Sequence, residues 1–102
     1  MRLNKQQMES FKQEIIDCLC HEKEITKIVI FGSFLHSKNP NDLDLAVFQD
    51  SLESYLPLAM KYRKKTRAIA RKIPMDIIPL KTGVRENSLL AEINQGEVIF
   101  ER

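Results

Sequence analysis

The sequence predicts a small α/β domain in which helices alternate with short β-strands. Two patterns carry this prediction: segments whose apolar residues recur every three or four positions, as on one face of a helix, and short β-branched or alternating runs between them. The length of 102 residues is typical of one domain, and 43% hydrophobic residues suffice for one core. We therefore expect a single domain over residues 1–102.

The first predicted element is an amphipathic helix over residues 5–20. Asn4 is suited to cap its start, and Gln7 three residues later completes a capping-box pattern. One side of the helix is apolar at helical spacing and carries Met8, Phe11, Ile15, Cys18 and Leu19.

Two strands are predicted on either side of a short turn and a polar loop. Residues 27–31 form a β-branched run that is typical of a buried strand. Residues 42–48 alternate, so that Asp42 and Asp44 share one face of the second strand. The opposite face of this strand carries Leu43, Leu45 and Val47.

A long helix is expected over residues 53–72. Its apolar positions are Tyr55, Leu58, Ala59, Tyr62, Ile69, Ala70 and Ile73, which places both tyrosines in the core. The remaining face is basic, and we interpret it as a solvated face, although it could bind a nucleic acid or an acidic partner. Its basic residues are Lys61, Arg63, Lys64, Lys65, Arg67, Arg71 and Lys72.

The last third of the chain predicts two strands and a short helix. A third strand over residues 75–80 contains Pro79, which indicates an edge strand or a strand end because proline cannot donate a backbone hydrogen bond. A short helix follows over residues 87–95, closed by Gly96. A last short strand is expected over residues 97–100.

Charge and hydropathy exclude several classes of protein. Sixteen basic and fourteen acidic residues leave a net charge of +2, which does not favour nucleic-acid binding but leaves it open. No apolar run approaches the roughly 18–20 residues that span a bilayer, and the first residues are too polar for a secretory signal. These features predict a cytoplasmic domain with no membrane partner, and they leave homo-oligomerisation undecided.

The two cysteines agree with a reducing compartment. Cys18 and Cys20 lie two positions apart on a helix, so they point to different faces and cannot form a disulfide with each other. With His21 they would provide three ligands for a structural zinc ion, but no second ligand pair exists in the sequence. We therefore interpret both cysteines as small buried residues.

Three aspartates on two predicted strands are the first chemical feature. Asp42 and Asp44 are two positions apart, about 6.5–7 Å along a strand, so their carboxylates can converge on one or two divalent cations. Solvation at a strand start would also explain these two residues. It would not explain Asp76, which lies in an otherwise apolar strand where a charge needs a partner or a metal. Carboxylate oxygens are the ligands that Mg²⁺ prefers, and Mn²⁺ accepts them too.

Gly32 and Ser33, directly after the first strand, are the second chemical feature. Glycine permits a tight turn and a close approach of a ligand to the backbone. Serine can start a helical turn and offers a hydroxyl and N–H groups to a phosphate. Alone this pair is a weak signal, but beside two strands that carry aspartates it predicts a phosphate-binding turn. His36, further along the same loop, could contact phosphate or act as a base, and we interpret it as a solvated polar residue.

Together these residues resemble the signature of the DNA polymerase beta-like nucleotidyltransferase superfamily. Phe-Gly-Ser at residues 31–33 is followed after eight residues by Asp-Leu-Asp-Leu at residues 42–45, and Asp76 matches the third carboxylate of the family. The length and the C-terminal segment are similar to the minimal nucleotidyltransferase branch, which contains MntA-like antitoxins.

The resemblance implies a small mixed β-sheet flanked by helices and a metal-dependent nucleotidyltransferase that uses ATP or another nucleoside triphosphate with Mg²⁺ or Mn²⁺. Asp42, Asp44 and Asp76 would be the catalytic and metal-binding residues, and Gly32 and Ser33 would bind the nucleotide phosphates. It also implies a partner, an all-helical HEPN-type toxin, on which the chain would act as an antitoxin by transferring AMP to a hydroxyl.

Three hypotheses of function stay open at this point. The chain is an adenylylating antitoxin, an antitoxin that binds its toxin without catalysis, or a catalytic subunit that acts on a small molecule or an RNA end. The carboxylates and the Gly-Ser turn favour an enzyme, because docking requires none of them. The sequence suggests no segment for an acceptor site, so we expect another molecule to present the acceptor.

Overall fold

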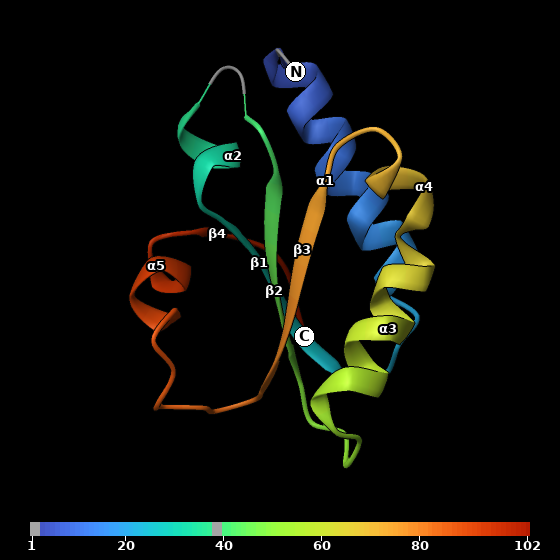
Figure 1. The fold of residues 1–102 in the computed structure, drawn as a ribbon, viewed down its shortest axis with the longest axis vertical. Helices are drawn as coiled ribbons and strands as arrows, with labels where there is room; N and C mark the ends of the chain where they lie inside the picture. Colours follow the sequence, from blue (N-terminus) through green and yellow to red (C-terminus); the bar gives the residue numbers. More distant parts are fainter. Residues whose placement is uncertain (1–2, 38–39) are drawn as a thin grey trace.

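A four-stranded mixed β-sheet forms the centre of the computed structural model, which describes residues 3–37 and 40–102 (Figure 1). The strands lie in the order β3-β2-β1-β4. β1 is antiparallel to β2 and to β4, whereas β2 and β3 are parallel. In chain order the elements are α1 (Lys5–Leu19), β1 (Ile25–Phe31), α2 (Ser33–His36), β2 (Leu43–Gln49), α3 (Tyr55–Lys65), α4 (Arg67–Ala70), β3 (Met75–Lys81), α5 (Leu90–Asn94) and β4 (Glu97–Glu101).

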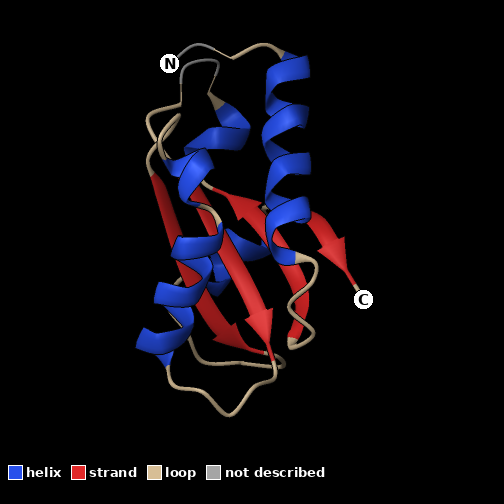
Figure 2. Ribbon diagram, turned by 90° about the vertical axis from the view of Figure 1, so that its right-hand side faces the viewer, coloured by secondary structure: helices blue, strands red, loops and turns tan. Residues whose placement is uncertain are grey.

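The sheet is covered on both faces, and the alternation along β2 separates them. Leu43, Leu45 and Val47 belong to the larger core cluster, which also contains buried residues of α1, α3 and α4. Ala46 and Phe48 belong to a smaller cluster that includes Ile93 of α5. Figures 1 and 2 show this arrangement, with α1, α3 and α4 on one side of the sheet and α5 on the other.

The predicted N-terminal helix is confirmed in detail. The side chain of Asn4 accepts a hydrogen bond from the backbone N–H of Gln7 at 2.8 Å, and the Gln7 side chain accepts one from the N–H of Asn4 at 2.9 Å. This reciprocal pair is the capping box expected from the sequence. Of the predicted apolar face, Phe11, Ile15 and Leu19 are buried, and Met8 and Cys18 pack half-buried against the core. Cys18 and Cys20 are free thiols, and both are half-buried rather than fully buried as we expected.

The long helix expected over residues 53–72 is wrong as a single element, because α3 and α4 are separate. Thr66 lies between them with φ −104° and ψ 15°, outside the helical range. Its buried hydroxyl donates a hydrogen bond to the backbone carbonyl of Tyr62 at 2.9 Å. A threonine that bonds back to the preceding turn in this way bends or ends a helix.

The two tyrosines of the long segment differ in burial. Tyr62 is fully buried, as expected, and its hydroxyl donates to Glu24 Oε2 at 2.9 Å. Tyr55 is 54% exposed, so its predicted place in the core is wrong. It is the first residue of α3, where helical spacing alone does not show whether the core extends beneath it.

The C-terminal elements follow the predicted order. β3 is an edge strand, which explains how Pro79 is accommodated within it. Gly96 follows α5, but it does not have the positive φ of a glycine helix cap; the positive-φ glycines in the described part of the chain are Gly32 and Gly83. Gly96 instead packs against β1, where an added Cβ would collide with the carbonyl oxygen of Ile30. Within residues 3–37 and 40–102, no helix is both long and apolar enough to cross a membrane.

Candidate active site

Three separate parts of the sequence meet at one end of the sheet. Because β1 is antiparallel to β2, the last residue of β1, Phe31, pairs with Asp44 near the start of β2. Because β2 is parallel to β3, Asp44 also pairs with Asp76, the second residue of β3. The pairing therefore brings Asp44 and Asp76 side by side on the α5 face of the sheet, next to the turn that follows β1.

The turn at Gly32 is shaped around Asp44. Gly32 has φ 80° and ψ −152°, a conformation essentially restricted to glycine. A Cβ added there would lie 2.5 Å from Asp44 Oδ2. The absence of a side chain at Gly32 thus lets the Asp44 carboxylate lie against the backbone of the turn.

Ser33 and Asp42 lie beside this contact. The short helix α2 begins at Ser33, as the sequence indicated, and the Ser33 hydroxyl donates a hydrogen bond to Asp42 Oδ1 at 3.3 Å. Asp42 directly precedes β2. The structure therefore places Gly32 next to Asp44 and Ser33 next to Asp42.

The surroundings of Asp44 destabilise the ionised form of its carboxyl group. Burial, reinforced by the negative charges of Asp42, Asp76 and Glu92, raises the pKa of Asp44 from 3.8 to about 6. Like charges that raise a pKa in this way are relieved by a cation or by protonation. A positive ion beside Asp44 would therefore lower the pKa of its carboxyl group.

Glu92, in α5, is a neighbour of Asp44 that the sequence analysis did not find. Its charge contributes to the raised pKa of Asp44, although the two residues are far apart in the sequence. Glu92 directly precedes Ile93, the buried residue that holds α5 on the sheet. Only that adjacency, an acid next to the one buried position of a short helix, could have pointed to it.

The donor chemistry of the site fits a hard divalent cation. Asp42, Asp44 and Asp76 offer only carboxylate oxygens, the ligands that Mg²⁺ and Mn²⁺ take. Among residues 3–37 and 40–102, however, no three His, Cys, Asp or Glu side chains are gathered closely enough to form a ready metal site. Asp76 is exposed, so its carboxylate has room to reorient.

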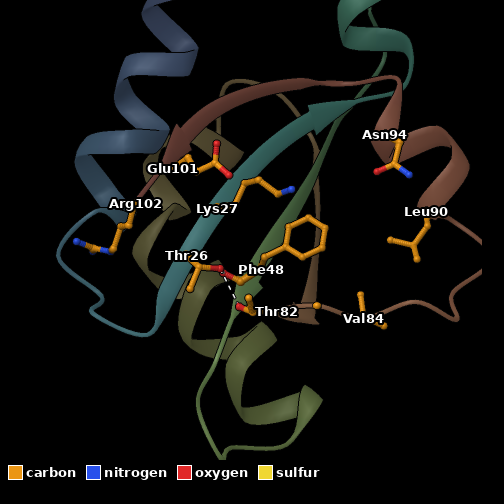
Figure 3. A pocket seen from close by; sticks show the side chains of 10 residues that line it. Thr26, Lys27, Phe48, Thr82, Val84, Leu90, Asn94, Glu101 and Arg102 are labelled. Carbon is orange, nitrogen blue, oxygen red and sulfur yellow. Dashed lines mark hydrogen bonds between the residues drawn. The ribbon is translucent and has the colours of Figure 1, made fainter.

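Two of the hollows on the described part of the surface lie away from these aspartates. One, of about 480 Å³, is lined by Lys27 and Phe48, with Leu90 and Asn94 of α5 (Figure 3). Phe48 is four residues after Asp44 on β2, about 13 Å along the strand. The other hollow, of about 540 Å³, is lined by residues of α1 and by His36, which is exposed at the end of α2.

A comparison with protein families identifies the family of this chain. The family described as "Polymerase beta, Nucleotidyltransferase" matches residues 13–102. The chain belongs to this nucleotidyltransferase family. The membership confirms the family seen in the sequence motif and supports nucleotidyltransferase activity. Among curated proteins, nothing matches the chain.

Solved structures of toxin–antitoxin complexes share the fold of this nucleotidyltransferase. A MntA–HepT mutant complex is 18% identical, with a TM-score of 0.66 over 89% of this chain and 73% of that one. A toxin–antitoxin structure with AMP-PNP is 21% identical, with the same TM-score of 0.66 and the same coverage of 89% and 73%. A tri-AMPylated HEPN toxin of Shewanella oneidensis in complex with its MNT antitoxin is 22% identical, with a TM-score of 0.60 over 93% and 73%. The expected mixed sheet flanked by helices is thereby confirmed.

Proposed function

We propose that this nucleotidyltransferase transfers AMP from ATP to a hydroxyl group of a helical HEPN-type protein, as the antitoxin of a toxin–antitoxin pair in the cytoplasm. The observation that carries the proposal is the juxtaposition of Gly32, Asp44 and Asp76, which are the family motif residues. It is supported by the relatives, one of which is bound to an AMPylated HEPN toxin and another to AMP-PNP.

The motif residues divide into metal ligands and phosphate ligands in the proposed reaction. The carboxylates of Asp42, Asp44 and Asp76 would hold Mg²⁺ or Mn²⁺, which when bound neutralises phosphate charge and lowers the pKa of an acceptor hydroxyl. The backbone N–H groups of the turn at Gly32 and Ser33 would bind the β- and γ-phosphates. The Ser33 hydroxyl, which now donates to Asp42 Oδ1, can donate to a phosphate oxygen instead.

Exposure favours Asp76 as the carboxylate next to the acceptor. Asp76 is exposed on the edge strand β3, whereas Asp44 is half-buried beneath the Gly32 turn. The acceptor oxygen attacks the α-phosphorus, the bond to pyrophosphate breaks, and the hydroxyl proton passes to the Asp76 carboxylate. The three reacting atoms must lie roughly in line, so a partner has to present its hydroxyl from the side opposite the leaving pyrophosphate.

The test is transfer of label from ATP to protein. The chain is incubated with α-labelled ATP, Mg²⁺ and the HEPN-type protein of its own genome, with Asp44→Asn as the matched inactive variant. We expect label on the partner with the natural chain and none with the variant. Formation of a stable complex without label would leave the non-catalytic antitoxin as the correct function, and label on RNA or on a small alcohol would replace the acceptor class.

A further inference from the structure

We propose that the outer face of α3 and α4 is the docking surface for the acceptor protein, and that this protein presents an apolar patch bordered by acidic side chains. The identity of the partner rests on the proposed function, whereas the surface rests on the structure alone. We define the docking face by an apolar group, Leu52, Tyr55, Leu56 and Met60, and a basic group, Arg63, Lys64, Arg67 and Arg71. Leu52 lies in the segment that leads into α3, and Arg71 directly follows α4.

The apolar group is an unusual concentration of exposed hydrophobic side chains. Within the described residues, the exposed large hydrophobics are these four and Val98. Leu52 is completely exposed, and Leu56 and Met60 are each 61% exposed. Single exposed apolar residues are normal, but a contiguous group marks an interaction site.

Helical spacing joins the apolar group to the basic group. Leu56, Met60 and Arg63 are four and three positions apart, so they lie along one face of α3. The buried residues of the same helix are Leu58, Ala59 and Tyr62. Tyr55 shares the side of Tyr62 by helical spacing, and it is exposed at the first position of the helix. α3 and α4 follow each other on one side of the sheet (Figure 1), and along the chain the docking face changes from apolar in α3 to basic toward α4.

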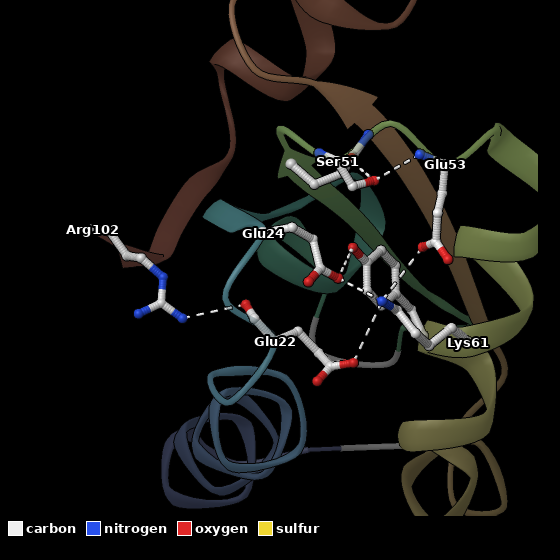
Figure 4. A network of polar contacts seen from close by, with 8 residues as sticks. Glu22, Glu24, Ser51, Glu53, Lys61 and Arg102 are labelled. Atoms are coloured by element: carbon white, nitrogen blue, oxygen red, sulfur yellow. Dashed lines mark hydrogen bonds and ion pairs between the residues drawn. The ribbon is translucent and has the colours of Figure 1, made fainter.

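The basic group has no acidic partners within the described part of this chain. Lys61, by contrast, is engaged: its Nζ lies 2.7 Å from Glu24 Oε2 and 3.6 Å from carboxylate oxygens of both Glu22 and Glu53 (Figure 4). Lys72 is paired with Glu14 at 3.0 Å. None of the described ion pairs involves the four cations of the docking face, so their charge is available to acids on another molecule.

The charge and polarity of the docking face favour one kind of binding partner. A symmetric contact centred on this face would set the apolar group of each copy against the four cations of the other copy, so neither group would meet a complementary partner. A nucleic acid would satisfy the basic group but leave Leu56 and Met60 without an apolar partner, because it binds through phosphates and base stacking. A protein surface that combines apolar and acidic side chains matches both groups.

The test measures binding and transfer separately, using the HEPN-type protein of the same genome. Leu56→Glu and Met60→Glu probe the apolar group, and the double variant Arg63→Glu/Arg67→Glu probes the basic group. Val98→Glu is the control for placing a charge at an exposed apolar site, and Arg85→Glu is the control for reversing a charge on the opposite side of the sheet. Thermal melts establish that each variant is folded, which the exposure of all these positions favours.

We expect the apolar variants to weaken the Kd by at least about 30-fold, as loss of a central contact does. The basic double variant should slow association about 10-fold at low salt, with a smaller effect at high salt. Both controls should bind as the natural chain does. Asp44→Asn should bind fully but transfer nothing.

The outcomes separate the docking face from the proposed function. Unchanged binding by both apolar variants, with normal transfer, overturns the docking face and leaves the function intact. Weakened binding without any AMP transfer by the natural chain overturns the function and supports the docking face. Self-association lost in Met60→Glu, or RNA binding lost only in the basic variant, would assign the face to the corresponding other occupant and overturn the proposal.

Discussion

The contact between Gly32 and Asp44 can be tested by adding one methyl group. In Gly32→Ala the new Cβ would lie 2.5 Å from Asp44 Oδ2, closer than any stable contact, and the residue would keep a backbone conformation that costs about 1–3 kcal/mol outside glycine. The carboxylate must therefore move. We expect a loss of stability and a nearly complete loss of nucleotidyl transfer.

Gly83 provides the control, because it also has a positive φ but no close neighbour. Its φ is 82°, close to that of Gly32, but an added Cβ there meets nothing within 4 Å. Gly83→Ala should therefore report backbone strain alone and retain transfer. The difference between the two variants measures the collision with Asp44.

A double-mutant cycle isolates the carboxylate. In Asp44→Ala the nearest remaining atom to the new Cβ is the Asp44 Cβ, at an ordinary contact distance of 3.7 Å. Gly32→Ala should thus cost less in this background, with a coupling energy of about 1–2 kcal/mol, within the range for residues in contact. Denaturant unfolding gives all four free energies. Additive effects, with Gly32→Ala as active as Gly83→Ala, would refute the view that the turn is shaped around Asp44.

Three further predictions concern the same site. ATP should bind with Mg²⁺ and hardly bind in EDTA, because the carboxylates alone repel a triphosphate; equal affinity in a calorimetric titration under both conditions would contradict the metal assignment. Without metal, the protonated Asp44 stabilises the fold below pH 3.8, and this contribution is lost as the pH rises through its folded pKa of about 6. The Tm of Asp44→Asn minus the Tm of the natural chain should therefore increase between about pH 4 and pH 7. A Tm difference that falls over this range would show that the ionised Asp44 stabilises the fold. Ser33→Ala should lower kcat/KM by roughly 10- to 150-fold, the value of one hydrogen bond to a charged group, and less than Asp44→Asn does; equal losses would show that the hydroxyl takes part in the chemistry.

The strands and the motif were predictable because their patterns are local. β-branched runs and acid–apolar alternation place β1, β2 and β3 to within two residues of their observed bounds. The pairing of Asp44 with Asp76, in contrast, depends on strand order and direction, which local patterns do not give; the residue types and the family resemblance suggested only that the two aspartates share a site. The sequence motif therefore anticipated which residues belong together, and the sheet shows by what pairing they do so.

The features that could not be predicted arise from tertiary contacts. Thr66 ends α3 through a hydrogen bond from a buried hydroxyl, although its apolar neighbours keep helical spacing on both sides. Gly96 is required by its packing on β1 rather than by its own backbone angles. Glu92 reaches the charge environment of Asp44 only because Ile93 fixes α5 on the sheet. None of these contacts leaves a periodic trace in the sequence.

The edge position of β3 connects the docking face to the aspartates. α4 ends at Ala70 and β3 begins at Met75, so only a few residues separate the basic end of the docking face from Asp76. α3 and α4, which carry the docking face, cover one side of the sheet, and Asp44 lies on the other side. Within the described residues, no strand extends the sheet beyond β3. A protein bound to α3 and α4 can therefore extend a segment of its chain around this open edge to the exposed carboxylate of Asp76. An additional strand paired with the outer edge of β3 would block that path without contacting the docking face or the aspartates. The proposed transfer therefore requires the open edge of β3.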